Sequence, residues 1–252
     1  MDRPLTARTP RQGLRNVDAV NWPMYALAVS ISLGLAIAAW AAPSWRATLL
    51  LAAVLAALPM LVSLIATAWV YDFSDLYQLP WAAALQRDDV HSVMVLNAGF
   101  DEITAAVRTS FPHATLRVLD FFDEERTRER SIARARALYP PDPSTARITP
   151  PRLPVESKRI DVAIAFMSLH ELRDARDRVA LLREVRRVLG DDGRLVVVEH
   201  MRDWRNAVAY AFGVFHFLSP SSWTHSFEQS GFKTRQVHFH TPLVRTYILE
   251  AQ

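Results

Sequence analysis

The sequence predicts an α/β fold with a mainly parallel sheet, preceded by two helices that cross a membrane. Two observations support this prediction. Residues 159–200 read as strand, helix and strand, the pattern of a right-handed crossover onto a parallel sheet. The first 71 residues contain two long stretches, 19–45 and 47–71, without a charged side chain. The chain therefore combines a membrane segment with one medium-sized domain.

The crossover rests on a change of periodicity along residues 159–200. Residues 161–166 are rich in Val, Ile and Ala, as in a strand that is buried on both faces. Residues 176–189 place apolar side chains at three- and four-residue spacings among arginines and acids, which predicts an amphipathic helix. Gly190 is expected to cap that helix at its C-terminus, and residues 195–198 form the next buried strand.

The composition of the 252 residues excludes several classes of function. Cysteine is absent, so disulfides, cysteine nucleophiles and cysteine-ligated metals are excluded. The formal net charge is only +3 and the sequence has no block of Lys and Arg, so we expect no nucleic-acid partner.

The N-terminal 71 residues predict a transmembrane hairpin. Residues 1–21 read as a disordered basic tail, and residues 22–71 hold two spans, each long enough to cross a hydrocarbon core of about 30 Å. A cleaved signal peptide or two buried soluble helices would be the alternatives, but the second apolar span and the scarcity of polar residues disfavour both. The basic tail predicts that the N-terminus, and hence the domain after two crossings, is cytoplasmic. Small residues at every fourth position would allow close helix packing, including homo-oligomers.

The remaining elements follow in order. Residues 72–90 link the membrane segment to a domain at 91–252. Residues 93–96 and 116–119 are the first strands, residues 101–110 and 123–138 are helices, and the Pro-rich residues 139–154 form a loop. We expect the 123–138 helix to be a solvated surface helix.

Residues 203–218 are too short for a third span and would cover a substrate pocket or lie at the membrane interface. Residues 223–230 form a helix, and residues 236–240 and 245–250 form a closing antiparallel hairpin.

Residues 159–200 also resemble the second half of a class I S-adenosylmethionine-dependent methyltransferase of the small-molecule and quinone-methylating type. The shared features are the apolar strand, the LHEL turn at 169–172, the helix ending in RVL at 187–189, a glycine-containing turn and a strand that closes at Glu199 and His200. The resemblance covers about residues 79–252. It implies a Rossmann-like, seven-stranded sheet and S-adenosylmethionine as the cofactor.

The resemblance implies a set of cofactor-binding residues at the ends of the strands. They are Asn97, Gly99, Asp120, Phe121, Thr149, Met167 and Ser168. Asp120 would accept hydrogen bonds from the ribose hydroxyls, and the backbone donors at the start of the 101–110 helix would face the methionine carboxylate. Three positions depart from the family pattern. Asn97 replaces an acid, Gly99 alone remains of three usual glycines, and Thr149 stands where an acid often contacts the adenine.

The candidate catalytic residues follow the fourth and fifth predicted strands. Methyl transfer requires alignment and, for a hydroxyl or an acidic carbon, removal of a proton. We predict His170 or His200 as the base, with Glu199 orienting a histidine or binding substrate. A structural hydrogen bond is the alternative role for each histidine. Candidate substrate-binding residues are Tyr77, Trp81, Glu171, Tyr210 and His216, although Tyr77 and Trp81 could be interfacial anchors or packing residues instead. No HExxH or comparable ligand spacing is present, so we expect no metal site.

Two functional hypotheses remain. The first is a membrane-anchored methyltransferase that acts on a lipophilic small molecule from the lipid bilayer. The second is a degenerate methyltransferase fold that serves as a membrane-bound binding or scaffold protein, which the altered glycine loop and Thr149 favour. A nicotinamide dehydrogenase is disfavoured because the G-x-G-x-x-G motif is absent.

Overall fold

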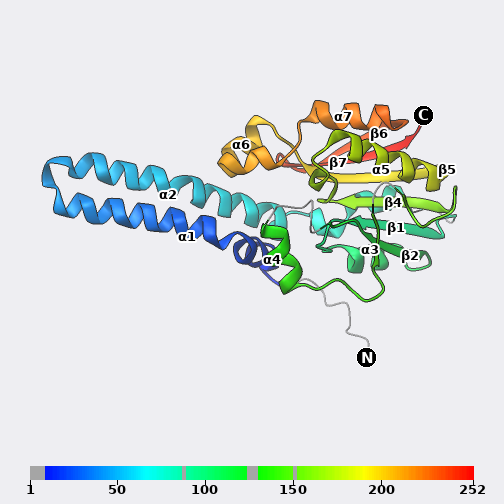
Figure 1. Cartoon of the computed structure of the whole chain (residues 1–252), viewed down its shortest axis with the longest axis horizontal. Helices are drawn as coiled ribbons and strands as arrows, with labels where there is room; N and C mark the ends of the chain where they lie inside the picture. Colours follow the sequence, from blue (N-terminus) through cyan, green and yellow to red (C-terminus); the bar gives the residue numbers. More distant parts are fainter. Residues whose placement is uncertain (1–8, 87–88, 124–129, 150–151) are drawn as a thin grey trace.

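The computed structural model describes residues 9–86, 89–123, 130–149 and 152–252. The described part consists of a helical hairpin that projects from one end of an α/β domain (Figure 1). Part of the predicted basic tail (1–8), part of the charged helix (124–129) and two prolines of the predicted loop (150–151) lie outside the described residues.

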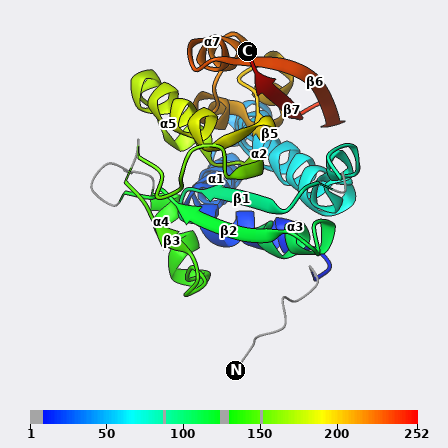
Figure 2. The same cartoon turned by 90° about the vertical axis from the view of Figure 1, so that its right-hand side faces the viewer.

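The domain is built on a seven-stranded sheet in the order β3-β2-β1-β4-β5-β7-β6 (Figure 2). The strands are β1 (Ser92–Asn97), β2 (Thr115–Asp120), β3 (Ala146–Arg147), β4 (Ile160–Phe166), β5 (Leu189–His200), β6 (Phe232–Thr241) and β7 (Val244–Ala251). The first five strands pair in parallel, whereas β7 is antiparallel to both β5 and β6. The predicted Rossmann-like sheet and its closing hairpin are therefore confirmed.

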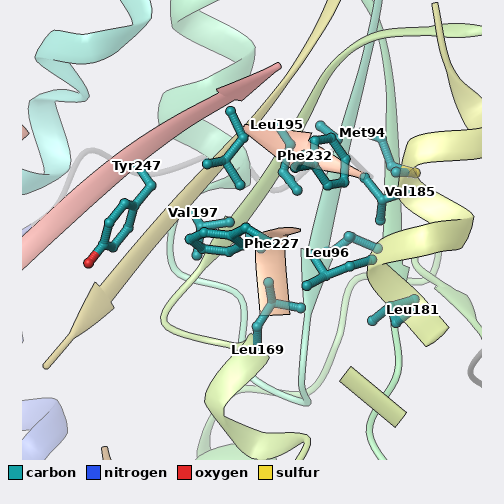
Figure 3. Close-up of a cluster of buried hydrophobic side chains, with 14 of the residues drawn as sticks. Met94, Leu96, Leu169, Leu181, Val185, Leu195, Val197, Phe227, Phe232 and Tyr247 are labelled. Carbon is teal, nitrogen blue, oxygen red and sulfur yellow. The ribbon is translucent and has the colours of Figure 1, made fainter. Parts of the chain in front are cut away.

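Helices cover both faces of the sheet. They are α3 (Thr104–Ser110), α4 (Arg130–Leu138), α5 (Ala175–Val188), α6 (Trp204–Tyr210) and α7 (Pro220–Gln229). On one face, α5 and α7 pack against β4, β5 and β7, and Figure 3 shows Leu181, Val185 and Phe227 meeting Val197 and other strand residues there. Because residues 162–166 of β4 and 195–198 of β5 are buried on both faces, these stretches are continuous apolar runs rather than alternating ones.

The turn between α5 and β5 differs from the prediction. Gly190 does not cap the helix, because β5 begins at Leu189 and pairs there with Ile160. The backbone N–H groups of Lys158 and Arg159 donate to the last carbonyls of α5, at 3.1 and 2.8 Å. These bonds satisfy carbonyl groups that a glycine cap would otherwise have to satisfy.

The hairpin consists of α1 (Gln12–Ala41), a short turn η1 (Pro43–Trp45) and α2 (Arg46–Ala68). Both helices are long and apolar enough to cross a membrane, with windows of mean hydropathy 1.8 and 2.7. Most of their large apolar side chains are exposed, including Leu33, Ile37 and Leu55. A soluble helix pair would bury such a surface against a core.

The first helix begins earlier than predicted, so residues 12–21 are helical rather than a disordered tail. The carboxylate of Asp72 accepts hydrogen bonds from the N–H groups of Gly13 and Leu14, at 2.8 and 2.9 Å. It therefore satisfies two of the free donors at the start of α1. Its negative charge also interacts favourably with the positive end of the helix dipole. Because Asp72 is 59 residues away from Gly13, the periodicity near the N-terminus gives no sign of this contact.

Three short helical turns link the hairpin to the sheet, namely η2 (Trp69–Phe73), η3 (Leu76–Gln78) and η4 (Pro80–Ala84). They pack with α3 on the second face of the sheet. Trp81 lies at the centre of this apolar cluster with 1% of its surface exposed. It therefore belongs to the core and does not cover a pocket as proposed from the sequence.

Candidate functional site

A cavity lies at the carboxyl ends of β1 and β4, where the strand order of the sheet reverses. The space within its walls, open solvent included, is about 460 Å³. The lining residues are Val95, Leu96, Asn97, Ala98, Phe100, Asp101, Glu102, Ile103, Ile132, Phe166, Met167 and Glu171. In open α/β sheets ligands bind at this reversal point. The cavity is therefore the candidate ligand site.

The loop after β1 forms one wall of the site. Gly99 has φ +95°, and a Cβ there would lie 2.9 Å from the Phe122 ring, so this position requires glycine. The Nδ2 atom of Asn97 is buried and has no hydrogen-bond partner among the described residues. Since an unpaired buried donor costs about 1–3 kcal/mol, this amide is available to a ligand.

The predicted N-terminal donors of the next helix are not free. Helix α3 starts at Thr104 rather than at Asp101. The Asp101 carboxylate accepts from the N–H groups of Ile103 and Thr104, at 3.1 and 3.0 Å. Two of the donors that were expected to face a ligand carboxylate are therefore occupied by Asp101.

Asp120 ends β2 as predicted and is 1% exposed, but it has a partner that the sequence did not indicate. Its Oδ2 forms a 2.6 Å ion pair with Nη1 of Arg136 from α4, and its Oδ1 accepts from the N–H of Phe122 at 2.9 Å. The Arg136 guanidinium also lies 4.5 Å from the Phe122 ring centroid. Helix α4 is thus more than a solvated surface helix, because Arg136 reaches the expected ribose position.

The first turns of α1 contact Glu102, one of the residues that line the cavity. Asn16 donates from Nδ2 to Glu102 at 3.0 Å, and Tyr77 donates to the other oxygen of Glu102 at 2.8 Å. Tyr139, which packs on Phe100, donates to Oδ1 of Asn16 at 2.6 Å. The sequence placed Tyr77 near the mouth but missed Asn16, because residues 1–21 were interpreted as a disordered tail.

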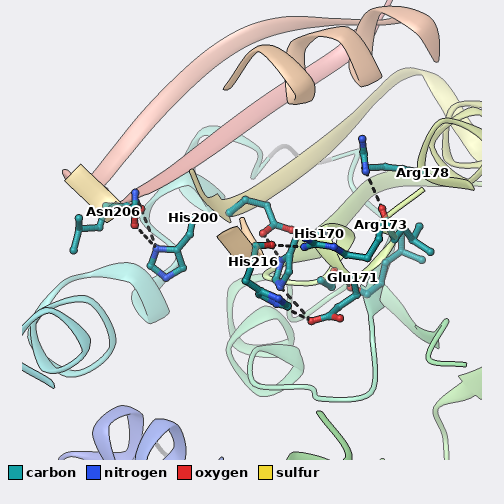
Figure 4. A network of polar contacts seen from close by, with 12 residues as sticks. His170, Glu171, Arg173, Arg178, His200, Asn206 and His216 are labelled. Atoms are coloured by element: carbon teal, nitrogen blue, oxygen red, sulfur yellow. Dashed lines mark hydrogen bonds and ion pairs between the residues drawn. The ribbon is translucent and has the colours of Figure 1, made fainter. Parts of the chain in front are cut away.

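A cluster of polar side chains borders the cavity on the β4 and β5 side (Figure 4). His170 and Glu171 lie on η5 (Leu169–Glu171), and Glu199 lies near the end of β5. His170 Nδ1 is 2.7 Å from Glu199 Oε2, and its Nε2 is 3.3 Å from Glu171 Oε1. The fourth member, His216, comes from η6 (Ala211–His216) and places Nε2 3.3 Å from the same Glu171 oxygen.

The charges of this cluster stabilise one another. Burial disfavours the charged form of His170, but the neighbouring carboxylates Glu199 and Glu171 outweigh it and raise the pKa of His170 to about 10. Burial alone would raise the pKa of Glu171, yet bonds to His170 and His216 hold that pKa well below its usual value. The two carboxylates therefore favour the charged form of His170, which argues against its role as the predicted base.

His200 does not join the cluster (Figure 4). Its Nδ1 lies 3.0 Å from the Leu243 carbonyl and 3.2 Å from Asn206 Oδ1, so Nδ1 carries the proton. Its Nε2 then accepts from the hydroxyl of Tyr71 at 2.8 Å. Burial lowers the pKa of His200 to about 4. Because both ring nitrogens are engaged away from the cavity, His200 holds η2 and the end of β5 together rather than serving as the base.

Protonation of His200 should therefore destabilise the fold. The unfolded chain binds this proton near pH 6.5 whereas the native protein excludes it down to about pH 4, so the free energy of unfolding falls as the pH decreases through this window. The loss amounts to about 3 kcal/mol at full effect. Urea unfolding of detergent-solubilised protein between pH 7 and pH 4 measures it. A His200→Gln variant should show a flatter pH profile, and a profile as steep as the parent's would contradict this role.

The other predicted site residues fall into two groups. Met167 lines the cavity in a left-handed conformation with φ 48°, and the buried Ser168 next to it donates to the Leu96 carbonyl at 3.0 Å. The remaining predictions are not placed at the cavity. Phe121 is buried in the core, Thr149 is exposed, and Tyr210 packs edge-on against His200 with its hydroxyl buried.

Comparison with known proteins shows which family model and which solved structures this domain resembles. Residues 90–197 match the family model described as a methyltransferase domain. No curated protein matches the chain. An S-adenosylmethionine-dependent methyltransferase from Aquifex aeolicus has a similar structure, with TM-score 0.50, 11% identity, and coverage of 76% of this chain and 97% of that one.

Two other similar structures are more distant. A putative type 11 methyltransferase from Sulfolobus solfataricus gives TM-score 0.44 and 15% identity, covering 64% of this chain and 85% of that one. LepI in complex with SAH and a substrate analogue gives TM-score 0.48 and 11% identity over 69% of this chain, which spans only 47% of LepI. The family match and the seven-stranded topology agree. Residues 90–197 are thus similar to a methyltransferase domain, and their fold is similar to that of an S-adenosylmethionine-dependent methyltransferase.

Proposed function

We propose that the chain is a membrane-anchored methyltransferase that transfers a methyl group from S-adenosylmethionine to a lipophilic small molecule. The observation that carries the proposal is the cavity at the reversal point of the sheet. It is bounded by the unpaired amide of Asn97 on one side and by Glu171 of the polar cluster on the other.

The residues present fit the cofactor. Asn97 Nδ2 is a buried donor without a partner, and the loop at Gly99 leaves no room for a Cβ. Asp120 ends the neighbouring strand β2, the place where a carboxylate can accept both ribose hydroxyls. For the ribose to reach Asp120, the Arg136 guanidinium has to leave its 2.6 Å ion pair, so cofactor binding should be coupled to a shift of α4.

The chain's own residues then have separate roles. When bound, the cofactor supplies an electrophilic methyl group. Asn97 and Asp120 would orient that cofactor, while Glu102, held by Asn16 and Tyr77, would exclude water from the mouth. Glu171 would face the acceptor from the cavity wall and orient it. Alignment of the two reactants accounts for most of the expected rate enhancement.

The exposed apolar surfaces support the lipophilic substrate. The windows of the two hairpin helices are only 11% and 17% buried within the protein, unlike the core helices of a soluble domain. Beside the hairpin lies α6, followed by η6, and together they expose Trp204, Val208, Phe212 and Phe215 (Figure 1). These side chains would enter the membrane interface next to the segment that carries His216. A hydrophobic acceptor could then reach the cavity from the bilayer, with the domain on the cytoplasmic side as the basic tail predicts.

One observation favours the alternative of a degenerate fold that serves as a binding or scaffold protein. The Asp120–Arg136 ion pair fills the expected ribose position. In a protein that binds no cofactor, this pair would stabilise the fold by neutralising the buried Asp120 carboxylate. The two functions differ in whether S-adenosylmethionine binds at all.

Methyl transfer in reconstituted vesicles tests the proposal. The full chain is placed in vesicles that contain lipid extract, and methyl-labelled S-adenosylmethionine is added outside. We expect label to accumulate in the organic phase and not in a parallel reaction with water-soluble acceptors. Protein that is folded yet neither binds the cofactor nor labels any fraction would support the scaffold function instead.

A further inference from the structure

We propose that His170, Glu171 and His216 form a binding site for one divalent transition-metal ion, with zinc as the expected occupant. The site goes beyond the proposed function, because binding of the ion requires neither the cofactor nor an acceptor. Sequence spacing gave no sign of it, since His216 lies 45 residues after Glu171 and no recognised ligand motif joins them.

The spacing of the three ligand atoms is the first argument. The Nε2 atoms of His170 and His216 each lie 3.3 Å from the same oxygen of Glu171. Charge-assisted hydrogen bonds are shorter, at about 2.7–2.9 Å. By contrast, ligands at about 2.0–2.1 Å from a tetrahedral zinc ion lie about 3.3–3.4 Å apart. All three ligand atoms lie within 4.8 Å of one another, so a small rotation of the more exposed His216 ring would complete the triangle.

The hydrogen bonds behind the ligands are the second argument. Glu199 Oε2 lies 2.7 Å from His170 Nδ1, and Glu199 Oε1 accepts from the His170 backbone N–H at 3.3 Å. A carboxylate bound to Nδ1 fixes the proton there, so the ion would replace the proton on Nε2, and the carboxylate makes that nitrogen a more basic ligand. Glu199 is 0% exposed, so the carboxylate is held in place. This carboxylate, histidine and metal arrangement is characteristic of protein zinc sites.

Hydrogen bonds to the backbone also hold the third ligand, His216, in place. Arg173 donates to the backbone carbonyls of His216 and Phe215 and thereby fixes the end of η6. The two imidazole rings meet edge to face, with centroids 4.8 Å apart and an interplanar angle of 78°. In Figure 4 the dashed lines from both rings converge on Glu171. Three chain segments therefore hold the ligand set, rather than one flexible loop.

The chemistry of the three ligand atoms determines which metal ion the site prefers. Two imidazoles and one carboxylate suit zinc and similar transition metals, whereas calcium and magnesium prefer sites made of oxygen ligands alone. Three protein ligands leave a fourth position for water or substrate. Because Glu171 also lines the cavity, that position would border the acceptor side. If the proposed function holds and the acceptor carries a hydroxyl, the ion would lower the pKa of that hydroxyl and favour loss of its proton to water.

Zinc titration of the tag-free, full-length chain in detergent tests the site. The protein is stripped with a chelator, dialysed and titrated with zinc chloride in a calorimeter. We expect one zinc per chain and a zinc-dependent rise in the unfolding temperature. Glu171→Gln and His216→Gln should abolish both effects. Glu199→Gln keeps all three ligands and should weaken binding about 10–100-fold.

His225→Gln is the matched control, because His225 is an exposed histidine on α7 and should leave the titration unchanged. Cobalt provides a second readout, since its visible absorption reports tetrahedral coordination and should be lost in Glu171→Gln. Circular dichroism identifies any variant that fails to fold. If a ligand variant fails to fold, the Glu199→Gln titration and the cobalt spectrum of the parent decide whether the site binds an ion. Substoichiometric zinc in the parent, or equal binding by His216→Gln and His225→Gln, would overturn the site. Cofactor binding is measured separately on the stripped protein, so failure of one proposal does not decide the other.

Discussion

Replacement of Asp120 by alanine is expected to weaken S-adenosylmethionine binding about 100-fold. A hydrogen bond to a charged group contributes about 1.5–3 kcal/mol, and the carboxylate would lose two ribose hydroxyls. A loss of about 3 kcal/mol corresponds to a factor of about 100 in the dissociation constant. Calorimetric titration of the detergent-solubilised parent and variant measures this difference.

Two further variants make the result specific. Asp161→Ala removes a carboxylate near the start of β4, which accepts from the N–H groups of His91 and Ser92, and should leave cofactor affinity unchanged. Arg136→Ala should raise the affinity, because the ribose would no longer compete with an ion pair for Asp120. Unchanged binding by a folded Asp120→Ala protein would refute the cofactor geometry, and a lack of binding by the folded parent would favour the scaffold function.

The second large effect concerns turnover rather than cofactor affinity. We expect Glu171→Gln to lower kcat by about 10²–10⁴, the usual contribution of a group that handles the reacting proton or positions the group that does. Glutamine keeps the shape of the side chain but cannot balance His170 and His216 or ligate an ion as a carboxylate. The rate of methyl incorporation into the lipid extract measures kcat, and calorimetry should show an unchanged cofactor affinity.

Glu228→Gln is the control for this substitution, because Glu228 is an exposed glutamate on α7, and its rate should equal that of the parent. A Glu171→Gln protein that is as active as the parent would exclude the cluster from the reaction. Equal losses in kcat and in cofactor affinity would instead indicate that Glu171 supports the fold of the cavity.

Much of the fold was predictable because its signals are local. The β4–α5–β5 crossover follows from two apolar runs and one amphipathic stretch, and the structure confirms all three elements. The errors arose where a distant residue determines the local structure. Residues 12–21 are helical because Asp72 caps them, and Gly190 lies in a strand because Leu189 pairs with Ile160. Neither partner is near in the sequence.

The site residues were likewise predictable only where the signal in the sequence is local. Strand ends identified Asn97, Asp120, His170 and Glu199, because parallel strands bring their carboxyl ends to one edge of the sheet. The sequence could not distinguish His200, one residue after Glu199, from His170. A strand directs successive side chains to opposite faces, so neighbours at a strand end can serve different purposes. Arg136 was not identified, and His216 was named only as a substrate candidate, because both lie on helices whose placement depends on tertiary packing.

The contact between the first turns of α1 and the cavity mouth has a mechanical consequence. Helix α1 has 30 residues and is about 45 Å long, which exceeds a hydrocarbon core of about 30 Å. The first turns of α1 contact the domain through Asn16 and through the bond from Gly13 to Asp72, so if the hairpin spans a membrane as proposed, its movement would be transmitted to Glu102. A thinner bilayer makes such helices tilt. Tilting would then pull on the Asn16–Glu102 bond and open the mouth, which would couple access to the cavity to the thickness of the surrounding membrane.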